Sequence, residues 1–107
     1  MNITENDVEK CLDYLRDSAT EYAQWRAAEK FYNQKIKAIE AQGFVSEEKG
    51  AVEARRMKAR ASDEYNQALD DLKEAAYNAE LIGARRSAAE LKISVYQTMA
   101  KVNRAGY

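Results

Sequence analysis

A run of residues that are small or apolar, with the single exception of Arg86, recurs at alternating intervals of four and three and constrains this chain more than any other feature. The run extends from Ala61 to Ala100, and the chain contains no proline that would interrupt it. Its members are Ala61, Tyr65, Ala68, Leu72, Ala75, Ala79, Ile82, Arg86, Ala89, Ile93, Tyr96 and Ala100. A mean spacing of about 3.5 residues places them on one stripe of an α-helix that supercoils against another helix. The sequence therefore predicts a long helix over residues 51–104.

A first helix is predicted over residues 5–42. Thr4 and Asp7 have the spacing of an N-terminal capping pair, and Gly43 is typical of the residue just after a helix end. The apolar stripe of this helix is expected to be Val8, Leu12, Leu15, Ala19, Tyr22, Trp25, Tyr32, Ile36 and Ile39. Residues 43–50 are then the predicted loop between the two helices.

These two helices predict an all-α fold, an antiparallel coiled-coil-like hairpin whose second helix is longer than its first. With 107 residues the chain has room for one domain, over residues 1–107. Gly83 lies within the second helical pattern and does not shift its phase, which favours a point of close helix approach. The alternative is a break near Gly83, which would give a three-helix bundle.

A turn at residues 43–50 predicts which residues pair across the hairpin. Leu15 is expected to face Tyr77, and residues after Ala88 are expected to extend beyond the first helix. This extension carries apolar residues on two faces, so we expect it to form a homodimer or a larger helical bundle. The predicted oligomer interface consists of Ile82, Ala89, Leu91, Ile93, Val95, Tyr96, Met99 and Val102.

Charge is balanced over the chain and unbalanced near its end. The sequence has 17 basic and 18 acidic residues, but residues 83–107 contain five bases and only one acid, Glu90. The bases are Arg85, Arg86, Lys92, Lys101 and Arg104, which we interpret as candidate contacts to nucleic acid or to an acidic partner. The simpler alternative is that these charges solvate a long helix and face the acidic start of the first helix.

Several classes of function lack their usual residues. The chain has no histidine, a single cysteine and no glycine-rich phosphate loop, so we expect no catalytic residues, no metal site and no cofactor, and hence no enzyme. Cys11 is expected to be a small buried residue. Neither a signal peptide nor a long apolar segment is recognisable, which predicts a cytoplasmic protein without membrane contact.

Parts of the sequence resemble a group of similarly short, uncharacterised helical proteins encoded by tailed bacteriophages. The resemblance is carried by "SEEKGAVEARRMKA" (residues 46–59), by Tyr65 and by "RRSAAELKISVYQTMAKVNR" (residues 85–104). It covers about half of the chain. Such proteins are often encoded near genes for single-strand annealing and single-strand binding proteins, so the resemblance implies an accessory role in phage DNA recombination or replication, in the host cell cytoplasm.

Residues and resemblance together predict a non-enzymatic protein that associates with itself and binds a phage or host protein. Binding of nucleic acid through the basic C-terminal segment is the less favoured alternative. A third hypothesis is a phage inhibitor of a bacterial defence complex, of the anti-CRISPR type.

Overall fold

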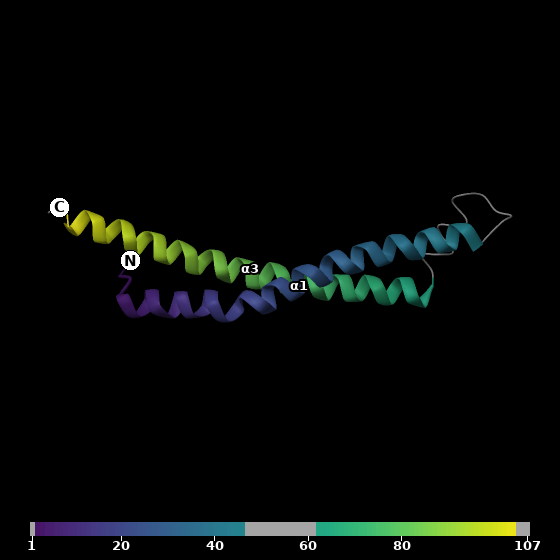
Figure 1. The fold of residues 1–107 in the computed structure, drawn as a ribbon, viewed down its shortest axis with the longest axis horizontal. Coiled ribbons are helices and arrows are strands. Elements are labelled where there is room, and N and C mark those ends of the chain that lie inside the picture. The colour runs from purple at the N-terminus through teal and green to yellow at the C-terminus, as the bar shows by residue number, and fades with distance from the viewer. Residues whose placement is uncertain (1, 47–61, 105–107) are drawn as a thin grey trace. The chain divides into compact units, whose positions relative to one another are not determined.

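Two long helices make up the described part of the protein. The computed structural model describes residues 2–46 and 62–104, and within these ranges it contains helix and no strand. Helix α1 spans Glu5–Ser46 and α3 spans Asp63–Arg104, each with 42 residues (Figure 1). The two helices pack against each other in opposite directions. The predicted all-α antiparallel hairpin is therefore confirmed.

The chain divides into two compact units, and α1 and α3 each contribute to both. Unit 1 comprises Met1–Ala23 and Glu80–Tyr107, and unit 2 comprises Gln24–Ala79. In unit 1 the purple start of α1 runs beside the yellow end of α3 (Figure 1). The buried side chains of unit 2 include Ile39, Ala68, Ala75 and Ala79.

A capping box begins α1, as the sequence predicts. The backbone N–H of Thr4 donates to the Asp7 carboxylate at 2.9 Å, and the N–H of Asp7 donates to the Thr4 hydroxyl at 3.2 Å. These reciprocal bonds satisfy two backbone donors that a helix start leaves unpaired.

The ends of the helices that face the turn differ from the prediction. Helix α1 continues through Gly43 to Ser46, so the predicted end at residue 42 is wrong. Helix α3 begins at Asp63, where the Ser62 hydroxyl accepts the N–H of Tyr65 at 3.1 Å as an N-cap. The predicted helix segment 51–61 and the loop residues 47–50 lie outside the described residues, as does the predicted extra length of the second helix.

The seam predicted for the second helix is the one that packs. The buried apolar residues of α3 are Ala68, Ala75, Ala79, Ile82 and Ala89, and all five belong to it. The least exposed positions of α1 include a matching series with the same spacing, namely Val8, Cys11, Leu15, Ser18, Tyr22, Trp25, Glu29, Tyr32, Ile36 and Ile39. Alternating intervals of three and four on both helices are the pattern of a coiled coil.

Two members of the stripe predicted for α1 are wrong. Leu12 is 52% exposed and Ala19 is also exposed, whereas Cys11 and Ser18 are buried in their place. The buried cysteine was expected, but a buried serine was not. Ser18 is accommodated because its hydroxyl has a hydrogen-bond partner on α3.

Pairing across unit 1 also differs from the prediction. The carbonyl of Leu15 accepts a hydrogen bond from Arg86 and not from the neighbourhood of Tyr77. At the start of α1, Glu5 lies close enough to Tyr96 to raise the pKa of its phenol, after burial, which has the larger effect. The pairing is shifted by about two and a half helical turns. Residues from Ala89 to Tyr96 therefore do have a partner within their own chain.

Gly83 lies inside the continuous helix α3, so the alternative of a break at this residue is wrong. A Cβ atom placed on Gly83 would lie 3.2 Å from the Tyr22 hydroxyl oxygen and 3.3 Å from the ring carbon Cε1. Gly83 is therefore the close-approach point that the unbroken register indicates. The group that approaches it is an aromatic ring on α1.

We predict that Gly83→Ala and Tyr22→Ala are energetically coupled. Alanine stabilises a helix interior by about 1 kcal/mol relative to glycine, but here its methyl group would overlap the Tyr22 ring. We expect Gly83→Ala to be near neutral alone and stabilising by about 1 kcal/mol in the Tyr22→Ala background. Urea denaturation of the four proteins in a double-mutant cycle measures this difference. Equal effects in both backgrounds would show that the ring does not restrict residue 83.

Candidate binding surfaces

The predicted oligomer interface divides into two sets on different faces of α3. Ile82 and Ala89 are buried within the chain, and Ile93 and Tyr96 are half-buried on the same seam. Burial and the neighbouring Glu5 raise the pKa of Tyr96, as expected for a phenol that packs against the start of α1. These four residues are used by the hairpin itself.

The remaining predicted interface residues lie on the outside of α3. Leu91 is 65% exposed, Val102 45% and Met99 40%, while Val95 is half-buried. Together with the exposed Ala84 and Ala88 they follow one face of the helix at intervals of three and four. We call this set the outer stripe: Ala84, Ala88, Leu91, Val95, Met99 and Val102.

Arg86 points into the hairpin and differs in this from the other predicted basic contacts. Its Nη1 donates to the carbonyl oxygen of Leu15 at 2.6 Å and to the Ser18 hydroxyl at 2.8 Å. The centre of the guanidinium lies 5.4 Å from the centroid of the Tyr22 ring, a cation–π distance. Arg86 therefore ties α3 to α1.

Arg85, Lys92, Lys101 and Arg104 are exposed, so these four can meet a partner. The arginine pair of the sequence is thus split between two roles. Arg86 connects the helices, and Arg85 faces outward. Sequence position alone does not separate them, because adjacent residues of a helix point about 100° apart and either could face the seam.

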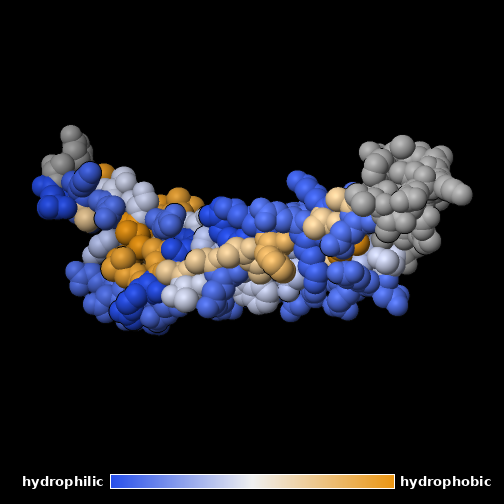
Figure 2. Space-filling model, turned by 45° about the vertical axis from the view of Figure 1, so that its right-hand side comes forward, coloured by the Kyte–Doolittle hydropathy of each residue, from blue (hydrophilic) through white to orange (hydrophobic). Residues whose placement is uncertain are grey.

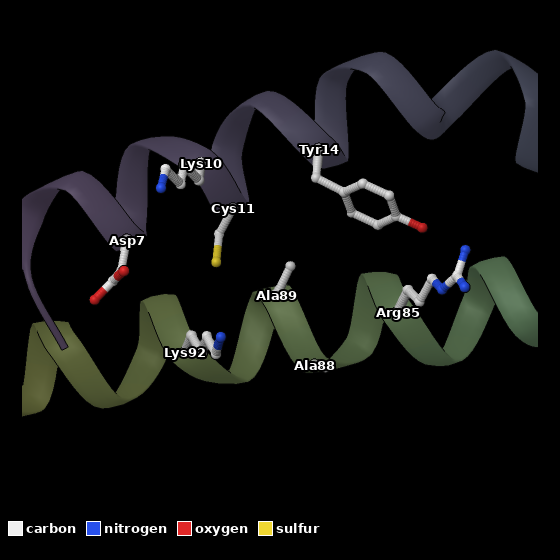
Figure 3. Close-up of a pocket in the computed structure, with 8 residues that line it drawn as sticks. All are labelled: Asp7, Lys10, Cys11, Tyr14, Arg85, Ala88, Ala89 and Lys92. Atoms are coloured by element: carbon white, nitrogen blue, oxygen red, sulfur yellow. The ribbon is translucent and has the colours of Figure 1, made fainter. Parts of the chain in front are cut away.

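A groove of about 350 Å³ lies between the two helices of unit 1. Helix α1 contributes Asp7, Lys10, Cys11 and Tyr14, and α3 contributes Arg85, Ala88, Ala89 and Lys92. In Figure 3 the Cys11 sulfur and the Ala89 methyl group point toward each other from the two helices. The groove thus has an apolar floor and charged groups around it.

Basic groups outnumber acidic ones around the groove by three to one, since Lys10, Arg85 and Lys92 face the single acid Asp7. The hydrogen bonds of the capping box, first that from the Thr4 backbone, lower the pKa of Asp7, and Lys92 and Lys10 lower it further. Asp7 therefore carries its charge, but much of its hydrogen-bonding capacity is used by Thr4.

Lys10, Cys11 and Tyr14 were missed as site residues by sequence analysis. They line the groove because of the observed pairing of the two helices, which brings Tyr14 close to Arg85. The predicted pairing would have placed Tyr14 near Tyr77 instead. The α1 series through Cys11 and Ser18 keeps a constant heptad spacing, whereas the series through Leu12 and Ala19 does not. That regularity was the available signal.

Neither a metal site nor a membrane span is evident in the described ranges. Residues 2–46 and 62–104 contain no group of three or more His, Cys, Asp or Glu side chains arranged to hold a metal ion. The searched helices also lack a segment long and apolar enough to cross a membrane.

No protein-family model matches the chain, and no curated protein or solved structure is significantly similar to it. The likeness to phage proteins stays a prediction. The candidate functional surfaces of unit 1 are the outer stripe and the groove between the helices.

Proposed function

We propose that this protein is a non-enzymatic binding module that pairs with a second copy of itself through the outer stripe and presents the paired hairpins to a macromolecular partner. The observation that carries the proposal is the exposed apolar face of α3. Figure 2 shows hydrophobic surface gathered in unit 1, near the end where the termini lie. Exposed Leu91, Met99 and Val102 contribute large apolar side chains to this unit.

The spacing of the outer stripe fits another α-helix. Its members are separated by intervals of four or three from Ala84 to Val102, and one repeated interval of four, from Val95 to Met99, is the only departure from the alternation of the buried seam. A helix with two such seams packs on both sides in helical bundles. The inner seam is occupied by α1, and the outer one is available to a second chain.

The outer stripe is complementary to itself when two copies run antiparallel. Its small residues lie toward one end and its larger residues toward the other. A two-fold axis near the middle of the stripe would therefore oppose small with large side chains, pairing Ala84 with Val102, Ala88 with Met99 and Leu91 with Val95. Such a symmetric contact is isologous and closes at a dimer.

Exposed bases border the outer stripe, so like charges approach each other when two stripes pair. Arg85 and Lys92 lie along one side and Lys101 on the other. Salt screens repulsion between exposed charges, and higher salt should therefore strengthen the dimer. Binding to nucleic acid has the opposite dependence, because salt competes with phosphate contacts.

Sedimentation equilibrium tests the proposed dimer. We expect wild-type protein to be dimeric at about 100 µM and Leu91→Glu to be monomeric with unchanged helix content, because the new carboxylate would be buried between two apolar stripes. The matched control is Gln97→Glu, which introduces the same charge at an exposed position outside the stripe. A monomeric wild type, or a Leu91→Glu variant that stays dimeric, would contradict the proposal.

Nucleic-acid binding is the second candidate, since Arg85, Lys92, Lys101 and Arg104 are exposed. A mobility-shift titration of DNA at low salt tests it. Binding that weakens steeply with salt and is lost when these four bases are changed to alanine would favour it. No shift at low salt would exclude it.

The identity of the partner is proposed from the resemblance to phage proteins. We propose a protein of phage recombination or replication, encountered in the host cytoplasm, and the third hypothesis substitutes a bacterial defence complex. Affinity purification from infected cells distinguishes them by the protein recovered. Recovery of no specific protein would count against both.

A further inference from the structure

The groove of unit 1 has the features of a binding site for a charged peptide. Lys10 comes from α1, and Arg85 and Lys92 come from α3, so three cationic side chains from two helices surround one depression. None of the three forms a hydrogen bond or salt bridge with any residue in the described part of the chain. Their hydrogen-bond donors are available to a ligand.

An anion is the complementary ligand for this set of charges. Asp7 is the only acidic residue that lines the groove, and its carboxylate is bonded to Thr4 at the helix start. Three cations against one engaged anion leave a net positive site. Carboxylates that approach from solvent would form charge-assisted hydrogen bonds with Arg85 and the two lysines.

The floor of the groove is apolar and therefore favours a ligand that also carries an apolar group. Cys11, Ala88 and Ala89 form this floor, and the Tyr14 ring adds an aromatic wall. These side chains are small, which is why a depression of about 350 Å³ exists between the helices. That volume accommodates one large side chain.

We propose that this groove binds an acidic peptide segment of the partner protein, with one bulky apolar side chain of the segment on the Cys11–Ala89 floor and its carboxylates on Lys10, Arg85 and Lys92. The inference rests on the proposed function, because it specifies the chemistry of the partner to which the paired hairpins would bind. The groove shares only Ala88 with the outer stripe, so peptide binding and self-association can be tested separately.

The arrangement favours a peptide over a nucleic-acid strand. A phosphate backbone is bound by bases spaced along a track. Here the bases surround a single apolar depression, and the site includes a carboxylate, Asp7, that would repel phosphates. An acidic peptide with an apolar anchor matches both the charges and the floor.

Fluorescence anisotropy with a synthetic probe tests the proposal. The probe is a fluorescein-labelled peptide in which one phenylalanine lies between pairs of glutamates. We expect saturable binding to the full chain, and about tenfold weaker binding when the phenylalanine is replaced by serine or when the protein carries Arg85→Ala with Lys92→Ala.

The matched control is Lys101→Ala with Arg104→Ala, which removes two exposed bases of the same helix outside the groove. This variant should bind the probe like wild type. Equal losses of affinity in both double variants would show a general charge effect and contradict the proposed peptide site. Tighter binding of a labelled oligothymidine than of the peptide would also contradict it. Sedimentation of the same samples separates failure of self-association, which leaves peptide binding intact, from failure of the groove.

Discussion

Arg86→Ala is expected to destabilise the hairpin by about 3 kcal/mol, a large effect for a polar side chain. The substitution removes two hydrogen bonds from a charged donor, to the Leu15 carbonyl and the Ser18 hydroxyl, and a cation–π contact with Tyr22. It also leaves the buried Ser18 without its partner on α3. Denaturation with urea, followed by circular dichroism, measures the loss.

Arg85→Ala is the matched control for this substitution. Arg85 is adjacent in sequence and carries the same charge, but its side chain is exposed, so its removal should change stability by no more than about 0.5 kcal/mol. Arg86→Lys should fall between the two, because an ammonium keeps the charge and loses the planar fork and the stacking. Similar losses for Arg85→Ala and Arg86→Ala would mean that the contacts of Arg86 do not hold the hairpin together.

Ala75→Asp is expected to destabilise unit 2 by about 3 kcal/mol or more. Ala75 is 0% exposed on the packed seam of α3, so a carboxylate at this position loses its water. Burial raises the pKa of such a carboxylate, and protonation removes the charge. The deficit relative to wild type should therefore shrink as the pH falls toward about 4. Thermal denaturation across this pH range measures both effects.

Ala27→Asp supplies the comparison for Ala75→Asp. Ala27 also belongs to unit 2 but is exposed on α1. There the same change should cost only the difference in helix propensity, about 0.7 kcal/mol, without the dependence on pH. If the two variants lost equal stability, the seam through Ala75 would not be a packed interface.

The packed seam of α3 could be predicted because its residues are apolar or small and hold one spacing over many turns. Arg86 entered the predicted seam by spacing alone, and its inward position agrees with that. The stripe predicted for α1 contains Leu12, whereas the structure buries Cys11, which keeps the heptad spacing of the seam. Spacing was the better guide, since packing geometry decides which face of a helix is covered.

The position of the turn could not be predicted, and this error shifted the pairing across the hairpin. Ser46 followed by two glutamates and Ser62 followed by Asp63 and Glu64 are equivalent helix-start signals. Local chemistry does not rank them. A turn at residues 43–50 leaves the end of the second helix without a partner, whereas in the structure Tyr96 lies beside Glu5 at the start of α1.

The error in the pairing also explains why only one of the two candidate surfaces was predicted. The outer stripe follows from spacing within one helix, so sequence analysis identified Leu91, Val95, Met99 and Val102. The groove needs residues from both helices, and the incorrect register placed Tyr14 and Arg85 apart. A surface on one helix can be predicted from periodicity alone. A site between two helices also requires the position of the turn, because the turn determines which residues pair across the hairpin.

Protection of single cysteines against alkylation tests the central claim most directly. In a Cys11→Ser background, cysteines replace Ala89 on the inner seam, and Ala84, Leu91 or Val102 on the outer stripe. We predict that the inner position is protected at every protein concentration, and that the outer positions react in dilute protein and become protected as concentration rises. Outer positions that react equally at all concentrations would contradict the account, as would an inner position that becomes reactive on dilution.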